Sequence, residues 1–185
     1  MLIAFALAVG AAALGVARGG TLEALAATKL RWTALLVGGL GLQVTLLAWS
    51  PTWLTGARAL LVLVVSNLAL VVFIAGNRRL PGMLVADVGL ALNLLVIVAN
   101  GAMPVSVEAA RAAGIGSGIG APRLEHEPMG PNTVLSWFGD VIPVPRLGEV
   151  WSVGDLVLAA GIARLVYVRT TARLKPRATV SRASG

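Results

Sequence analysis

The sequence predicts an all-α integral membrane protein: a bundle of five transmembrane helices with a long outer segment containing short interfacial or re-entrant helices. Composition is the first reason. Of the 185 residues, 12% are charged and 57% apolar, and the mean hydropathy is +0.87, whereas a soluble domain carries about 25% charged residues. A soluble fold with so many apolar residues would have to expose large apolar patches. The second reason is that five apolar segments have near-spanning length, and the third is that four of the five tryptophans lie at segment ends.

Each predicted span is bounded by residues that stop an apolar helix. The first ends at Arg18 followed by two glycines, and because this charge follows the apolar run instead of preceding it, we expect a retained span and not a signal peptide. The other spans end at Ser50-Pro51, at Asn77-Arg78-Arg79, at Asn100-Gly101 and in a basic tail. The spans cover residues 2–17, 32–49, 57–76, 82–99 and 153–168. We expect residues 1–170 to form one transmembrane domain, with an outer segment at 101–151 and a cytoplasmic tail at 171–185.

The basic residues predict the orientation of the bundle. Ten of the fifteen lie on one side: Arg18, Lys29, Arg31, Arg78, Arg79, Arg169, Arg173, Lys175, Arg177 and Arg182. Four lie on the other side: Arg58, Arg111, Arg123 and Arg146. By the positive-inside rule the N-terminus is outside and the tail is cytoplasmic, which fits a bacterial plasma membrane protein. The net charge of +7 is therefore a topology signal, and a nucleic-acid partner is not expected.

The outer segment is too long for an ordinary connection, and such lengths are usually functional or disordered. We expect a short helix at 105–113 and a second short apolar helix at 134–138. Residues 141–145 are expected to be extended, because two prolines interrupt them. Apolar pieces of this kind are typical of a segment lying on, or dipping into, the outer membrane face.

Two ionisable residues lie inside spans, Asp87 and Arg164. Each is about five residues from a cytoplasmic end, so at about 1.5 Å per residue both are roughly 7 Å deep. Charged groups in a membrane are costly and are usually paired, so we predict an ion pair between two helices. A proton or ion relay is the alternative.

The remaining polar residues suggest a weak site under the outer segment. Asn93, Asn100 and Asp155 are candidate binding residues, although Asp155 also has the spacing of a capping box with Ser152. His126 is a weak catalytic candidate as a general acid or base, with Asp140 or Asp155 orienting it. With no cysteine and one histidine, neither a metal site nor a cofactor is expected.

The motifs together resemble a known family. Residues 100–106, Asn-Gly-Ala-Met-Pro-Val-Ser, and 152–155, Ser-Val-Gly-Asp, are similar to elements of a family of small bacterial integral membrane proteins catalogued only as a domain of unknown function. The resemblance covers nearly the whole chain. It implies a polytopic membrane protein and no particular activity.

Three functions remain open from the sequence. The first is a non-enzymatic membrane component: a subunit, scaffold or assembly factor that contacts lipids and other membrane subunits or forms a homo-oligomer. The second is an oligomeric channel or small-solute transporter using Asn93, Asn100 and Asp155. The third is an outer-face enzyme using His126. Sparse catalytic chemistry and abundant small-residue helix faces favour the first.

Overall fold

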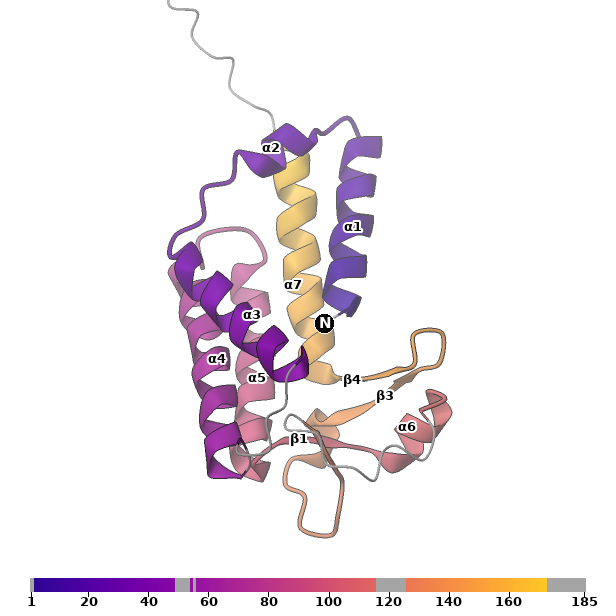
Figure 1. The fold of residues 1–185 in the computed structure, drawn as a ribbon. Helices are drawn as coiled ribbons and strands as arrows, with labels where there is room; N and C mark the ends of the chain where they lie inside the picture. The colour runs from indigo at the N-terminus through magenta and orange to yellow at the C-terminus, as the bar shows by residue number, and fades with distance from the viewer. Residues whose placement is uncertain (1, 49–53, 55, 116–125, 173–185) are drawn as a thin grey trace, which may run out of the picture.

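The protein is mostly helical, with a small mixed sheet at one end of the helices (Figure 1). The computed structural model describes residues 2–48, 54, 56–115 and 126–172. The basic tail from residue 173, Trp49, Trp53 and the glycine-rich stretch at 116–120 lie outside the described residues. The long helices are α1 (Leu2–Ala17), α3 (Thr33–Ala48), α4 (Ala57–Gly76), α5 (Met83–Asn100) and α7 (Val153–Thr170).

The helix boundaries confirm the segments predicted from sequence to within two residues. The membrane assignment is supported only in part. Within the described residues two helices, α4 and α5, are long and apolar enough to cross a membrane, whereas α1 and α3 are shorter apolar helices. The helices pack in the order α1, α7, α5, α4 and α3, and a short helix α2 (Leu22–Ala26) connects α1 to α3.

The close approach of α5 and α7 sets the register of the bundle. Gly89 leaves no room for a side chain, since a Cβ there would lie 2.5 Å from the Gly154 carbonyl oxygen. Gly161 likewise faces the backbone of Ala86. Ala86 and Gly89 therefore lie on the surface of α5 that contacts α7. Such faces allow helix backbones to approach where lipid offers no hydrophobic drive.

Apolar side chains fill the space between the helices in two clusters. The larger joins α4 and α5 through Leu70, Phe73, Ile74, Met83 and Leu90. Leucines of α3 and α7 pack against its edge. The smaller cluster lies at the other end of α4 and α5 and includes Met103 from the first strand, so the sheet is packed onto the helices and does not hang free.

The expectation of an all-α fold is wrong for the outer segment. The described part of this segment contains four strands, β1 (Met103–Val105), β2 (His126–Pro128), β3 (Asp140–Val144) and β4 (Glu149–Ser152), in the order β2-β1-β3-β4. The pairs β1–β2 and β1–β3 are parallel and β3–β4 is antiparallel. Strands of three to five residues are too short for an alternating pattern to be recognised, which is why the sequence did not predict a sheet.

The two short helices predicted in this segment have different outcomes. α6 (Val107–Ala112) forms as expected, with the Ser106 hydroxyl accepting a hydrogen bond from the Ala109 N–H at 3.2 Å. The second is only a single 3-10 turn, η2 (Ser136–Phe138), because Leu135 adopts a left-handed conformation with φ 55° and prevents a longer helix.

Candidate functional site

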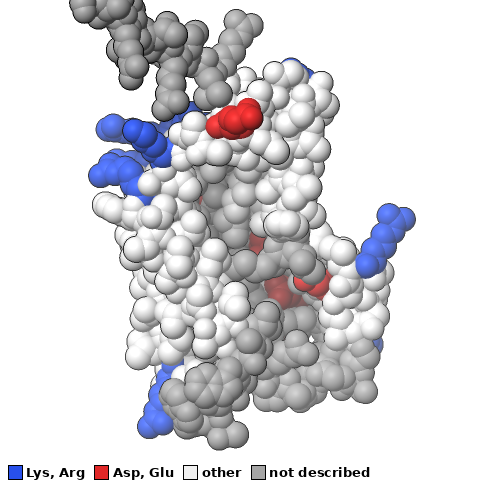
Figure 2. Space-filling view, turned by 45° about the horizontal axis from the view of Figure 1, so that its top comes forward, with Lys and Arg blue, Asp and Glu red and all other residues white. Residues whose placement is uncertain are grey.

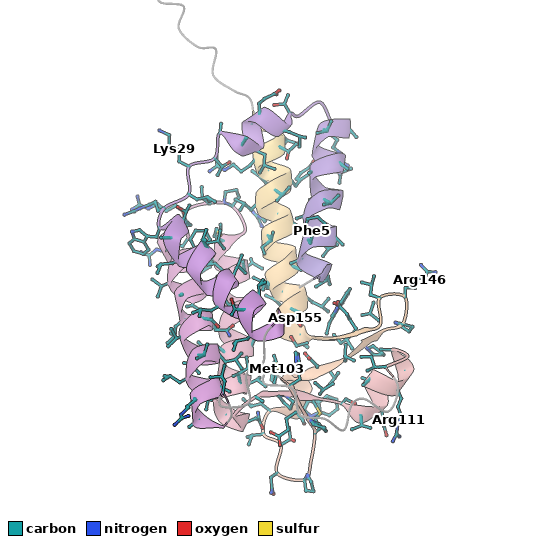
Figure 3. All side chains as sticks on the ribbon, viewed as in Figure 1. Phe5, Lys29, Met103, Arg111, Arg146 and Asp155 are labelled. Carbon is teal, nitrogen blue, oxygen red and sulfur yellow. The ribbon has the colours of Figure 1, made fainter. Side chains whose placement is uncertain are left out.

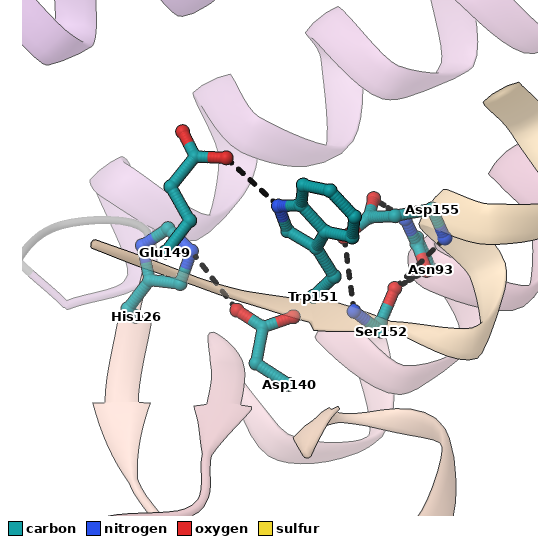
Figure 4. A network of polar contacts seen from close by, with 7 residues as sticks. All are labelled: Asn93, His126, Asp140, Glu149, Trp151, Ser152 and Asp155. Carbon is teal, nitrogen blue, oxygen red and sulfur yellow. Dashed lines mark hydrogen bonds and ion pairs between the residues drawn. The ribbon is translucent and has the colours of Figure 1, made fainter. Parts of the chain in front are cut away.

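A polar network lies where the sheet meets the helix bundle, and it involves four of the residues singled out from the sequence (Figure 4). Asn93 projects from α5 toward the start of α7. Its Nδ2 donates a hydrogen bond to Asp155 Oδ1 at 2.8 Å, and its Oδ1 accepts one from the Ser152 hydroxyl at 2.9 Å. Ser152 is fully buried. These two bonds join the beginning of α7 to the middle of α5.

Ser152 and Asp155 also form the capping box predicted from their spacing. The Ser152 hydroxyl accepts from the Asp155 N–H at 2.9 Å, and Asp155 Oδ2 accepts from the Ser152 N–H at 3.1 Å. Both donors would otherwise be unpaired at the helix start. Each polar atom of the Ser152 and Asp155 side chains thus has a structural partner. The Ser152 hydroxyl is not placed to act as a nucleophile, since it is buried and already donates to Asn93.

The second part of the network is an ion pair across the sheet. His126 Nε2 on β2 lies 3.4 Å from Asp140 Oδ2 on β3. The Asp140 side chain is only 6% exposed, whereas the His126 side chain is 44% exposed. Burial raises the pKa of Asp140, and the neighbouring Asp155 adds to this, while the hydrogen bond and charge of His126 oppose it. A buried carboxylate that orients a half-exposed imidazole is an arrangement that can support acid–base chemistry.

The edge of the network is held by a contact within β4. The Trp151 indole N–H donates to Glu149 Oε2 at 2.8 Å. These side chains stand on the same face of the strand, since they are two residues apart. The network as a whole fastens the sheet to α5 and α7, and its only acid–base pair is His126 with Asp140.

The predicted ion pair between Asp87 and Arg164 is not present in the described part of the chain. Asp87 Oδ1 is buried and has no hydrogen-bond partner. The α5–α7 register explains the separation, since the Arg164 Cβ lies beside Gly82, about five residues along α5 from Asp87. The prediction from residue counts that the two side chains lie at the same depth is therefore wrong by about five residues. Among the described residues no group of three or more potential ligands could hold a metal ion.

Asn100 belongs to a different feature that the sequence did not predict. Its side chain pairs with the backbone of Val134 on both sides: Nδ2 donates to the carbonyl oxygen and Oδ1 accepts from the N–H, each at 2.9 Å. Nδ2 also donates to Val96 O at 2.9 Å. The residue after Val134 is Leu135, which has the left-handed φ. Asn100 therefore pins the outer loop to the last turn of α5.

The same arrangement recurs at the opposite end of the bundle. Asn77, which follows α4, accepts from the Arg31 N–H and donates to the Arg31 carbonyl oxygen, each at 2.9 Å, and donates to Phe73 O at 2.8 Å. The residue after Arg31 is Trp32, with φ 57°. We call these two features the Asn77 clamp and the Asn100 clamp. The only hint in the sequence is an asparagine at the C-terminal end of an apolar helix.

A pocket of about 310 Å³ opens beside the Asn100 clamp. It is lined by Asn100, Pro104, Glu127 and the turn at 130–133. His126 is next to Glu127 on the same strand, and successive side chains of a strand point to opposite faces. The pocket and the His126–Asp140 pair are therefore separate features.

Comparison with known proteins identifies a family but no activity. Residues 27–167 match a family described as a family of unknown function, DUF5317. No curated protein and no solved structure matches the chain. The match covers four of the five long helices and the whole sheet.

Proposed function

The chain belongs to DUF5317, a family of unknown function, so we propose its role from its own geometry: a five-helix bacterial plasma-membrane protein that serves as a non-enzymatic component of a larger assembly. In this proposal α1, α3, α4, α5 and α7 cross the bilayer. The sheet and α6 lie at the outer face, and the tail is cytoplasmic.

The lateral surface of the bundle is the observation that carries the proposal. Large apolar side chains are exposed on all five helices, among them Phe5, Val37, Leu61, Leu95 and Val168. Only 39% of the residues in the apolar windows of α4 and α5 are buried, whereas the core helix of a soluble protein would be mostly buried. An apolar surface this extensive requires lipid or a partner to cover it.

The distribution of charge along the molecule supports insertion of the helices into a bilayer. On the face shown in Figure 2, Lys and Arg side chains gather toward the ends of the molecule, and the helix surface between them is nearly free of charge. Figure 3 shows Lys29 at one end, and Arg111 and Arg146 at the end with the sheet. Charged side chains are costly inside the hydrocarbon, and long basic side chains near helix ends extend to the membrane surface.

The proposal of a non-enzymatic role rests on the hydrogen bonds that the polar residues make within the protein. Ser152, Asp155 and Asn93 satisfy one another and hold α7 against α5. Asn100 holds the outer loop. These residues are thus engaged within the protein, and their hydrogen bonds offer no support to a channel or transporter.

Membrane insertion and orientation can be tested by cysteine labelling, because the chain has no cysteine of its own. In intact cells a membrane-impermeant maleimide should label Arg146→Cys and leave Lys29→Cys unlabelled until the cells are opened. Equal labelling of both positions in intact cells, or recovery of the chain in the soluble fraction, would contradict the proposal.

The assembly role requires its own experiment. Purification of the tagged full chain from its native membrane in mild detergent should recover a stoichiometric protein partner or a homo-oligomer. Recovery as a monomer would argue against it.

The His126–Asp140 pair favours one second candidate, an outer-face acid–base enzyme. His126→Gln removes the ionisable ring while keeping a polar side chain. If a deletion phenotype is rescued as well by His126→Gln as by the wild type, the enzymatic candidate is excluded.

A further inference from the structure

The corner of the bundle around the Asn77 clamp combines three unusual features. The Asn77 clamp holds the backbone of Arg31 against the end of α4. Trp32 adopts φ 57°, a conformation that a bulky side chain rarely takes. Its ring lies against Gly76, where a Cβ would approach the indole to 2.6 Å. An unfavourable backbone conformation held by its surroundings is typical of functional positions.

In this conformation the Trp32 ring and the Arg31 guanidinium lie side by side. The Arg31 guanidinium lies 5.5 Å from the centre of the Trp32 ring, within cation–π distance. Trp32 nevertheless remains 51% exposed. An indole fixed at a helix end and half exposed suits the boundary between headgroups and hydrocarbon.

Positive charge is concentrated at this corner. Arg78 and Arg79 directly follow Asn77. Because Asn77 is bonded to the Arg31 backbone, the three arginines lie at one corner of the bundle. Lys29 is two residues from Arg31. All four basic side chains are exposed. Glu23 is the only carboxylate in the described connections at this end. Figure 2 shows several Lys and Arg side chains gathered on the upper left of the face drawn there.

The opposite clamp provides an internal comparison. The Asn100 clamp has the same hydrogen bonds and the same left-handed residue after the clamped one, and Trp137 nearby is 82% exposed. Beside it, however, are prolines and Glu127, with no cluster of arginines among the described residues. An exposed tryptophan thus lies close in sequence to each clamp, and among the described residues only the Asn77 end adds a cluster of arginines.

We propose that Arg31, Trp32, Arg78 and Arg79, positioned by the Asn77 clamp, form a binding site for the headgroup of an anionic phospholipid on the cytoplasmic side. The arginines contact the phosphate, which planar guanidinium groups recognise well. The Trp32 ring covers the glycerol and upper acyl region. This inference rests on the proposed membrane insertion, and basic pockets at the ends of membrane helices are known to select such lipids.

The test compares lipid binding by matched charge variants of the full chain. Phosphatidylglycerol or phosphatidylcholine is titrated into the detergent-solubilised protein, and bound lipid is counted by native mass spectrometry. We expect the wild type to prefer phosphatidylglycerol. The double variant Arg78→Gln/Arg79→Gln should bind it about 25-fold more weakly, since each basic side chain near the lipid contributes about fivefold. The control Arg111→Gln/Arg146→Gln makes the same charge change at the other end and should stay within about twofold of the wild type.

Variants of the two clamp asparagines extend the binding experiment without changing the net charge. Asn77→Ala should weaken phosphatidylglycerol binding, and Asn100→Ala should not. If Asn77→Ala fails to fold, the arginine variants still decide the question. Equal loss in both charge variants would show dependence on net charge alone and overturn the site, as would a wild type with no preference.

Three further outcomes distinguish a lipid from soluble phosphate as the ligand, and failure of this inference from failure of the proposed membrane function. If inorganic phosphate displaces phosphatidylglycerol at equal concentration, the site is one for soluble phosphate and the lipid assignment is wrong. If the chain cannot be reconstituted into phosphatidylcholine vesicles, the proposed membrane function fails. If it inserts there but shows no preference for the anionic lipid, only the present inference fails.

Discussion

Gly89→Ala tests the contact on which the arrangement of α5 and α7 depends. The new Cβ would lie 2.5 Å from Gly154 O and 2.9 Å from the Leu158 Cα. Favourable contacts of a carbon atom are about 3.5–4.0 Å long. The two helices would therefore have to separate by about 1 Å. Backbone atoms cannot move aside as a flexible side chain would.

The expected cost follows from three terms. Overpacking of this kind costs about 1–3 kcal/mol. The move would also stretch the Ser152–Asn93 hydrogen bond of 2.9 Å, which contributes about 1 kcal/mol. Replacing glycine by alanine within a helix returns about 0.5–1 kcal/mol. The net destabilisation should be about 1–3.5 kcal/mol.

The matched control is Gly41→Ala, in helix α3. No atom lies within 4 Å of a Cβ at this position, so only the helix-propensity term remains and the variant should be about 0.5–1 kcal/mol more stable than the wild type. Unfolding free energies can be measured in mixed micelles of neutral detergent and dodecyl sulfate by far-ultraviolet circular dichroism. If the two variants differ by less than about 0.5 kcal/mol, α5 and α7 are not in backbone contact.

Three further predictions concern the polar residues. Ser152→Ala should cost about 2–4 kcal/mol, because a cap and a buried partner are lost together, whereas Ser106→Ala, which removes only the cap of α6, should cost about 1 kcal/mol in the same unfolding assay. Burial raises the pKa of Asp140. The stabilisation from this residue is therefore complete below the ordinary Asp pKa and is lost as the pH rises through the raised pKa of the folded state. The wild type should gain stability relative to Asp140→Asn as the pH falls from 7 toward 4, and a stability difference that does not change with pH would contradict the burial of Asp140. Because Asp87 and Arg164 are not paired, the double variant Asp87→Arg/Arg164→Asp should be no more stable than the less stable single variant, and a restored wild-type stability would reinstate the pair.

The long helices could be predicted from sequence because each is a continuous apolar run with a recognisable stop. The start of α7 could also be predicted from sequence, because Ser152 and Asp155 have the spacing of a capping box and form one. The sheet could not be predicted, because β1 and β2 are three residues each and pair with segments distant in the chain. From the neighbouring sequence alone, Met103-Pro104 looks like the end of a helix. Its place in a strand depends on parallel pairing with β2, which is distant in the chain.

The candidate site was predictable as a group and less so in its details. Asn93, His126, Asp140 and Asp155 lie in one network, as their expected positions under the outer segment suggested. Asn100 instead clamps Val134. Which residues of two neighbouring helices meet depends on which small residues pack against each other. Counting residues from the end of a span does not give that register. This is why the Asp87–Arg164 pair was expected and is absent.

The two asparagine clamps show what local sequence reasoning lacks. Asn77 and Asn100 each look like an ordinary helix stop, a role that needs no distant partner. Their side-chain amides have a donor and an acceptor group side by side, which matches the N–H and C=O of a single residue, so each can hold a loop far away in sequence. At Arg31 and Val134 the match is complete, and the next residue takes the rare left-handed conformation. Because the hydrogen bonds and the left-handed residue occur together at both ends, and an exposed tryptophan lies at or near that residue in each case, one recurring arrangement explains them more simply than two unrelated turns.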